Sequence, residues 1–228
     1  MTITTCVFDA YGTLFDVTSA ARSAASEPGH EELAALWPKL AEDWRRKQLE
    51  YSWLRAITGA HADFWAVTED ALDWAMEASA LTDPALRVRL MDLYAELQAY
   101  PEVPTILEAL KSQGYATAIL SNGSPQMLAA AVTSAGLVTH LDAVLSVESC
   151  GIFKPAPQVY DLVGQHFGCA NDQVLFVSSN GWDAGCATGY GFITAWVNRA
   201  GAPVDRLPWR PSHTLANLTP IPSLARSL

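Results

Sequence analysis

The sequence predicts an α/β protein that consists of a Rossmann-like parallel sheet core with an inserted all-helical cap domain. Short runs rich in β-branched and aromatic residues alternate with segments of helical character. The runs are apolar on both faces, as expected for strands of a parallel sheet that helices cover on two sides. A long stretch without such runs follows the first of them, and this stretch predicts the inserted helical block.

Five apolar runs are predicted as strands. The first, Ile3–Phe8, ends at Asp9 and is soon followed by Gly12, which indicates a buried strand that opens into a tight loop. Four similar runs occur later in the chain, at Tyr115–Leu120, Ala143–Val147, Val174–Val177 and Phe192–Val197.

The segments that separate the later strands are predicted as helices. A glycine follows each of them, at the position where a left-handed residue commonly ends a helix. The helical segments are Val103–Gln113, Pro125–Ala135, Pro157–Phe167 and Trp182–Thr188, and the glycines are Gly114, Gly136, Gly168 and Gly189.

Residues 17–100 are predicted to form the cap domain, and residues 1–16 and 101–228 the core domain. We expect the cap over the carboxyl ends of the strands, where open α/β sheets bind their ligands. The Pro-rich tail after Gly201 is expected to run along the surface as an extension. Amphipathic-helix spacing in the cap is carried by Leu33, Leu36, Trp37, Leu40 and Trp44, and helical periodicity continues through Leu72, Met76, Leu86, Leu90, Leu93 and Leu97.

Composition and charge exclude several classes of function. The formal net charge of -10, with only 14 Lys and Arg, argues against a nucleic-acid partner. No apolar run reaches the ~18 residues of a membrane span, and the first residues lack the features of a signal peptide, so we expect a cytoplasmic location without membrane contact. The four cysteines and five histidines show no metal-ligand spacing, which favours reduced, buried thiols.

Polar residues follow four of the predicted strands or the loops next to them. They are Asp9, the pair Ser121 and Asn122, Lys154, and the segment 178–183. Because the carboxyl ends of parallel strands lie at one edge of the sheet, we expect these side chains to converge on one crevice.

The motifs FDAYGTLFD, ILSNG, FKPAPQVY and VSSNGWD resemble those of the haloacid dehalogenase superfamily, and most closely those of the L-2-haloacid dehalogenases. The resemblance covers nearly the whole chain and is weakest over residues 19–40 and after residue 200. It implies catalytic roles for Asp9, Lys154, Asp183, Arg45, Ser178, Asn180 and Thr13. It implies substrate-binding roles for Tyr11, Ser121, Asn122, Leu49, Phe64, Tyr160 and Trp182.

The resemblance implies hydrolysis of small L-2-haloalkanoic acids to D-2-hydroxy acids and halide, with inversion at carbon 2. Asp9 would attack carbon 2 and form an ester, while Arg45 and Asn122 receive the halide beside an apolar wall of Phe64 and Trp182. Arg45 and Leu49 belong to WRRKQLEYSWLR, which resembles the family's cap-helix signature. The family also suggests a homodimer.

The second half of the implied reaction uses water. Asp183, held by Lys154 and the polar segment around Asn180, would activate a water that cleaves the ester. Ser121 and backbone N–H groups near Tyr11 would hold the substrate carboxylate. The remaining polar residues, Thr13, Tyr160 and Ser178, would fix the nucleophile and its partners.

The sequence departs from the phosphatases of the same superfamily. Tyr11 stands where those enzymes have a second aspartate, and residues 178–180 are Ser, Ser and Asn where acids would surround magnesium. A hard dication needs several anionic oxygens, so we expect no metal and no other cofactor. A departing halide needs no proton, so the missing general acid is consistent with dehalogenation.

Other interpretations of these residues are less specific. A metal-dependent small-molecule phosphatase of the same fold and a non-catalytic binding protein are the alternative functions. Asp9 alone could be a turn residue, and Asp183 could serve only the helix dipole. Likewise, Arg45 could belong to a charged helix face, and Phe64 and Trp182 could be ordinary core aromatics.

Overall fold

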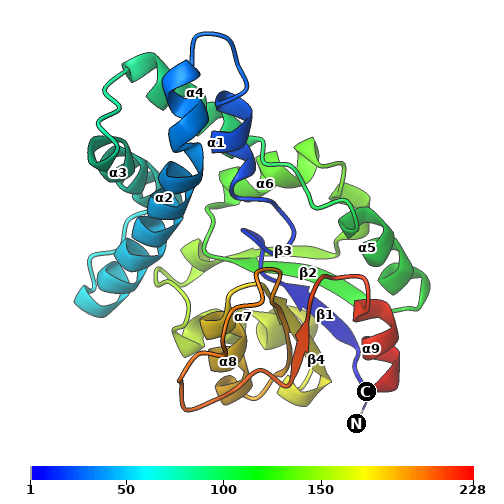
Figure 1. The fold of residues 1–228 in the computed structure, drawn as a ribbon. Coiled ribbons are helices and arrows are strands. Elements are labelled where there is room, and N and C mark those ends of the chain that lie inside the picture. Colours follow the sequence, from blue (N-terminus) through cyan, green and yellow to red (C-terminus); the bar gives the residue numbers. More distant parts are fainter. Residues whose placement is uncertain (1) are drawn as a thin grey trace.

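The computed structural model describes residues 2–228 and confirms the predicted fold class. Its centre is a six-stranded, all-parallel sheet with strand order β3-β2-β1-β4-β5-β6 (Figure 1). The strands are β1 (Thr5–Phe8), β2 (Ala116–Ser121), β3 (Ala143–Ser146), β4 (Val174–Ser178), β5 (Ile193–Val197) and β6 (His213–Leu215).

Strand β1 lies in the middle of the sheet and is buried along its whole length. Val7 pairs with Ala118 of β2 on one side and with Phe176 of β4 on the other. Because all three strands run in the same direction, they end at one edge of the sheet. The ladder continues one residue beyond β1, since the Asp9 N–H donates to the Val177 carbonyl at 2.9 Å.

Helices cover both faces of the sheet. Figure 1 shows α7 and α8 on one side and α5 and α6 on the other. These helices are α5 (Val103–Ser112), α6 (Pro125–Ser134), α7 (Pro157–Phe167) and α8 (Gly181–Tyr190); 3-10 turns lie at Val138–His140, Val147–Ser149 and Asn171–Gln173. The apolar runs of the sequence are thus buried from two sides, which explains why they do not alternate with polar residues.

Four helices follow β1 and pack on one another, with α2 against α3 and α1 against α4. We refer to them together as the helical block, and β1 runs toward it in Figure 1. The amphipathic stripe of α2 buries Leu33, Leu40 and Trp44, and the Trp44 indole donates to the Thr68 carbonyl of α3 at 2.9 Å. The block consists of α1 (Ser19–Ala24), α2 (Glu31–Thr58), α3 (Phe64–Ala78) and α4 (Pro84–Ala95).

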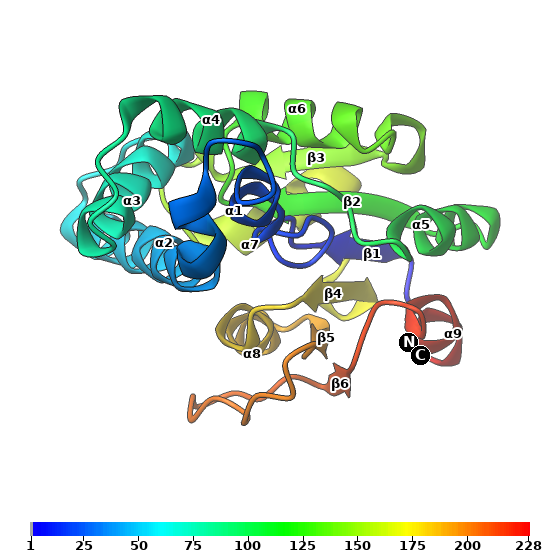
Figure 2. The same cartoon turned by 45° about the horizontal axis from the view of Figure 1, so that its top comes forward.

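The prediction for the C-terminal tail was incomplete. His213–Leu215 forms β6 as a parallel edge strand beside β5, and Ile221–Ser227 forms helix α9, which packs on α5. Figure 2 shows both elements at the end of the chain. A strand of three residues within a Pro-rich segment carries too little periodicity to be recognised from sequence.

Gly189 does not end α8, contrary to the prediction. It lies inside the helix, and Gly191, with φ +116°, is the left-handed residue that follows the helix. A Cβ atom at Gly189 would lie 2.3 Å from the ring of Trp209, so this glycine makes room for the tail.

The four cysteines are unpaired as expected, but only Cys6 is buried. Across residues 2–228, every helix is too short or too polar to cross a membrane.

The loop after β1 depends on a residue without a side chain. Gly12 has φ +88°, and a Cβ atom there would lie 2.9 Å from Ser179 Oγ. We predict that Gly12→Ala lowers the free energy of unfolding by about 1–2 kcal/mol, because alanine is strained in the left-handed region. Urea denaturation followed by circular dichroism measures the change.

Gly164→Ala is the matched control for this substitution. Gly164 lies within helix α7, and an added Cβ atom would make an ordinary contact of 3.6 Å with the Cys169 carbonyl. The stability of this variant should stay equal or rise, since alanine is the better helix former. Equal stability losses in the two variants would contradict the account of the loop.

Candidate active site

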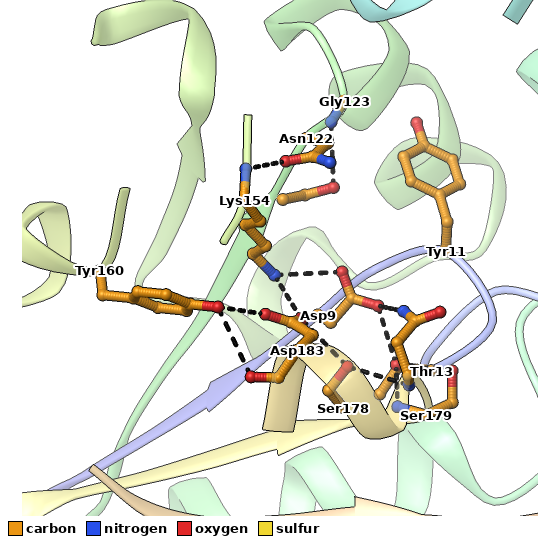
Figure 3. A network of polar contacts seen from close by, with 12 residues as sticks. Asp9, Tyr11, Thr13, Asn122, Gly123, Lys154, Tyr160, Ser178, Ser179 and Asp183 are labelled. Carbon is orange, nitrogen blue, oxygen red and sulfur yellow. Dashed lines mark hydrogen bonds and ion pairs between the residues drawn. The ribbon is translucent and has the colours of Figure 1, made fainter. Parts of the chain in front are cut away.

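Asp9 lies directly after β1, at the carboxyl edge of the sheet, and is the centre of a buried polar network (Figure 3). One carboxylate oxygen, Oδ2, accepts hydrogen bonds from Thr13 Oγ1 at 3.1 Å and from Asn180 Nδ2 at 2.9 Å. The other, Oδ1, accepts from Lys154 Nζ at 3.2 Å. These three donors fix the direction of the carboxylate.

Lys154 bridges two carboxylates in the interior. Its ammonium lies 3.2 Å from Asp9 Oδ1 and 2.9 Å from Asp183 Oδ2, and its side chain is only 1% exposed. Burial lowers the pKa of Lys154, but attraction by Asp183 and Asp9 outweighs burial and holds the pKa above its usual value. The side-chain carbonyl of Asn122 accepts from the Lys154 backbone N–H at 2.9 Å, which holds the loop after β2 against this segment.

Asp183 lies in the first turn of α8 and is fully buried. Its Oδ1 accepts from the Tyr160 hydroxyl at 2.7 Å, and its Oδ2 accepts from Ser178 Oγ at 3.0 Å as well as from Lys154. Burial raises the pKa of Asp183, and the charge of Asp9 adds to this effect. The attraction of Lys154 and the hydrogen bonds from Lys154 and Tyr160 lower it only in part.

A second set of contacts joins the loops after β1 and β4. The Ser179 N–H donates to Thr13 Oγ1 at 2.8 Å, and the Asn180 N–H donates to Ser178 Oγ at 3.1 Å. The Asn180 side chain contacts Asp9 and not Asp183, so the predicted support of Asp183 by this segment passes only through Ser178. Sequence analysis placed Ser179 in the polar segment 178–183 but gave it no role, because a backbone N–H carries no residue-type signal.

Arg45 reaches this network from the helical block. Its Nη2 donates to the Tyr11 carbonyl at 3.1 Å and to Asn180 Oδ1 at 3.3 Å. Its Nη1 donates to Oε1 of Gln48, a buried residue to which sequence analysis also gave no role. Gln48 in turn donates to the Thr68 and Tyr94 hydroxyls at 2.7 and 3.0 Å, so the guanidinium is held by a chain of buried polar groups.

These elements enclose a small pocket between the sheet edge and the helical block. The pocket is narrow, with a volume of about 10 Å³. Every lining residue belongs to the set predicted from sequence. The lining residues are Asp9, Tyr11, Arg45, Leu49, Phe64, Ser121, Asn122, Lys154, Asn180 and Trp182.

Some predicted residues lie behind the pocket wall. Thr13 donates to Asp9, Asp183 accepts from Lys154, and Ser178 donates to Asp183, but none of these three residues lines the pocket. Tyr160 does not line the pocket: its hydroxyl contacts Asp183 from the side away from Asp9 (Figure 3). This position agrees with its expected role in fixing the partners of the nucleophile and not with direct substrate binding.

The backbone of the loop after β1 is also more occupied than predicted. The Gly12 N–H donates to the Phe15 carbonyl at 2.7 Å, and the Thr13 N–H donates to the Ala10 carbonyl at 3.2 Å. These two amides near Tyr11 are therefore engaged within the loop and do not face a substrate.

Fold and site define an α/β protein with a carboxylate–ammonium–carboxylate centre at the carboxyl edge of its parallel sheet, closed by helices inserted after the first strand. The sequence matches the haloacid dehalogenase-like hydrolases over residues 3–189. The chain belongs to this family, which confirms the resemblance found in the motifs.

Named relatives place the chain more closely within the family. (S)-2-haloacid dehalogenase 1 of Pseudomonas sp. (strain CBS-3) is 43% identical over 225 residues, or 97% of this chain and 96% of the relative. (S)-2-haloacid dehalogenase 4A of Burkholderia cepacia is 46% identical over 201 residues, or 88% of this chain and 85% of the relative. A solved structure of L-2-haloacid dehalogenase from Xanthobacter autotrophicus, with chloropropionic acid covalently bound, has a TM-score of 0.86 at 37% identity and covers 99% of both chains.

The bridging lysine generates a prediction about stability. Lys154→Met leaves two buried carboxylates without their cation, so we expect a loss of about 3–5 kcal/mol in the free energy of unfolding. Without the ammonium, the pKa of Asp183, which burial already raises, rises further above its unfolded-state value. The free energy of unfolding should then fall as pH rises from the unfolded-state pKa of this carboxyl group to its folded-state pKa. Urea denaturation at pH 5 and pH 8 measures the difference.

Lys39→Gln provides the control for this experiment. Lys39 is 63% exposed and pairs with Asp43 on the surface of α2. Exposed pairs contribute about 0–1 kcal/mol, so this variant should resemble the wild type at both pH values. If Lys154→Met were as stable as Lys39→Gln, the charge balance described above would be wrong.

Proposed function

We propose that the protein hydrolyses small L-2-haloalkanoic acids to D-2-hydroxy acids and halide through an ester on Asp9. The observation that carries this proposal is the Asp9–Lys154–Asp183 chain, which lies at a narrow pocket whose opposite wall carries the Arg45 guanidinium. The covalently bound chloropropionic acid in the Xanthobacter relative supports a covalent route.

In the first step, a carboxylate oxygen of Asp9 attacks carbon 2 of the substrate from the side opposite the halogen. The new carbon–oxygen bond forms as the carbon–halogen bond breaks, and the halogen leaves with the electron pair as halide. No proton is needed, because a halide is a weak base. Arg45 and Asn122 supply donors to the departing anion, and Phe64 and Trp182 form an apolar wall beside it.

The substrate carboxylate needs its own anchor in an acidic protein. Ser121 is buried at the end of β2 and lines the pocket, so we assign its hydroxyl to this carboxylate. Its Oγ already accepts from the Gly123 N–H at 3.1 Å, which leaves the hydroxyl proton available for an anion.

In the second step, water attacks the carbonyl carbon of the Asp9 ester. Asp183 accepts the proton of this water, and the proton then passes to the departing alkoxide of the product. The water oxygen stays in the Asp9 carboxyl group, which loses the second water proton to solvent, so each turnover releases one proton together with the halide. Because Asp183 does not line the pocket, we place this water beside the Lys154 ammonium, which contacts both carboxylates.

The reaction as proposed needs neither metal nor other cofactor. The Lys154 ammonium occupies the position between the two carboxylates, where a dication would meet a like charge. Tyr11 replaces the acid that a phosphatase would use toward a phosphate ester. In the described part of the chain, no three His, Cys, Asp or Glu side chains gather as a metal site would require.

We further propose that residues 17–100 act as the cap domain. Arg45 and Leu49 of α2 and Phe64 of α3 close the pocket opposite the sheet edge, which supports this division. The unpaired cysteines favour a cytoplasmic location. Homodimer formation stays a prediction from the family resemblance.

Halide release tests this function directly. We predict chloride from L-2-chloropropionate but not from the D enantiomer, with a rate that is unchanged by EDTA. A magnesium-dependent phosphatase would instead release phosphate from esters and lose activity with the chelator. Asp9→Asn should lower chloride release at least 10³-fold, whereas the exposed Asp92→Asn should leave it unchanged. Release from the D form alone would contradict the proposal.

The pH dependence of turnover tests the role of Asp183. The pKa of Asp183 is raised, and the reaction needs its ionised form. As pH decreases, activity should therefore be lost at a pH higher than the usual pKa of a carboxyl group. Tyr160→Phe removes a donor that favours the ionised form of Asp183, so the acid limb of the pH–activity profile should move to higher pH. Tyr115→Phe, outside the site, is the control. A limb that stays in place in Tyr160→Phe would exclude Asp183 as the proton acceptor.

A further inference from the structure

An apolar groove borders the active-site pocket on the side of Trp182. Its wall on the helical block is formed by α2, where Leu49, Trp53 and Ile57 follow one another at four-residue spacing on one helix face. Leu49 lines the pocket, whereas Trp53 and Ile57 line the groove. The same helix face therefore runs from the pocket into the groove.

The wall on the sheet side is continuous in the same way. Trp182 of α8 lines both spaces, and Cys186, one turn later, lines only the groove. Lys154 lines the pocket, while its neighbours Phe153 and Pro155 line the groove. Three separate segments thus pass from one space to the other, so the groove is an extension of the active site.

Trp182, which lines both spaces, packs against Trp53, which lines the groove. The rings of Trp53 and Trp182 meet edge to face, with centroids 5.3 Å apart and an interplanar angle of 87°. Within residues 2–228, the Trp53 indole N–H has no hydrogen-bond acceptor. Packing alone holds this ring, so turning it away from Trp182 breaks no hydrogen bond.

The two spaces differ greatly in size. The volume of the pocket is about 10 Å³ and that of the groove about 510 Å³. In the pocket, Asp9, Lys154 and Arg45 present charge to a substrate. An alkyl chain that extends from carbon 2 along Leu49 and Trp182 avoids these charges and runs in the direction of the groove.

We propose that the groove binds the alkyl tail of 2-haloalkanoic acids that are too long for the pocket, and that Trp53 controls its passage. The proposal rests on the proposed function, because it assigns the tail of the same substrate whose carbon 2 meets Asp9. Trp53 thereby becomes a specificity-determining residue. Each tail methylene buried in the groove strengthens binding by a factor of about four.

The test uses 2-bromopropionate, 2-bromohexanoate and 2-bromooctanoate, with bromide release measured for each. In the wild type, KM should be lower for 2-bromooctanoate than for 2-bromohexanoate, since the two extra methylenes lie in the groove. Trp53→Ala should raise kcat/KM for 2-bromooctanoate relative to 2-bromopropionate by about tenfold, because it removes the constriction.

Two surface variants distinguish an effect of the groove on specificity from an effect of losing any exposed apolar side chain. Ile57 is 82% exposed at the groove, and Val88 is 57% exposed on α4, away from it. Ile57→Ser should lower the ratio of the two kcat/KM values by about fourfold, because it removes part of the apolar wall. Val88→Ser should leave that ratio unchanged.

The outcomes separate the subsite from the proposed function. If the ratio moves in neither Trp53→Ala nor Ile57→Ser while 2-bromopropionate is still hydrolysed, the subsite is refuted and the function stands. If the wild type releases bromide from none of the three acids, the function itself fails. Circular dichroism checks folding, and Trp53→Phe replaces Trp53→Ala if the latter does not fold.

Discussion

The structure depends on one buried cation that is shared by two buried carboxylates. Lys154 lies between Asp9 and Asp183, and all three side chains are almost completely removed from water. Taking such charges out of water is costly unless they are paired and hydrogen bonded. Thr13, Asn180, Ser178 and Tyr160 supply the additional donors. Because two carboxylates and one ammonium leave a negative charge, the Arg45 guanidinium at the pocket brings the centre closer to neutrality.

The fold makes this charge arrangement possible. Parallel register brings the ends of β1, β2 and β4 to one edge of the sheet, where Asp9, Asn122 and Ser178 meet the loop that carries Lys154. The helical block then closes the pocket with Arg45, and the buried chain through Gln48, Thr68 and Tyr94 holds that guanidinium in place. A buried site of this kind strengthens electrostatic interactions and limits the water that can reach the ester.

The sequence predicted the pocket better than the groups that support it. Pocket residues such as Asp9 and Lys154 follow strands or lie in motifs, so residue type and position identify them together. Ser179 acts through its backbone N–H, and Gln48 lies among charged residues of α2, so neither had a distinguishing signal. Tyr160 was assigned to the pocket through the family resemblance, and a motif match identifies a residue without showing which side of Asp183 it contacts. The short strand β6 and the position of Gly189 depend on the packing of the tail, which local sequence does not encode.

The same arrangement implies that the Asp9 carboxylate becomes covalently bound to the substrate. Single-turnover hydrolysis of L-2-chloropropionate in heavy-oxygen water, with enzyme in excess, tests it most directly. Mass spectrometry of the peptide that contains Asp9 should then show heavy oxygen in that side chain, while the lactate formed carries ordinary oxygen from the carboxylate. Heavy oxygen in the lactate of the first turnover, with Asp9 unlabelled, would mean that water attacks carbon 2 directly and would contradict the account.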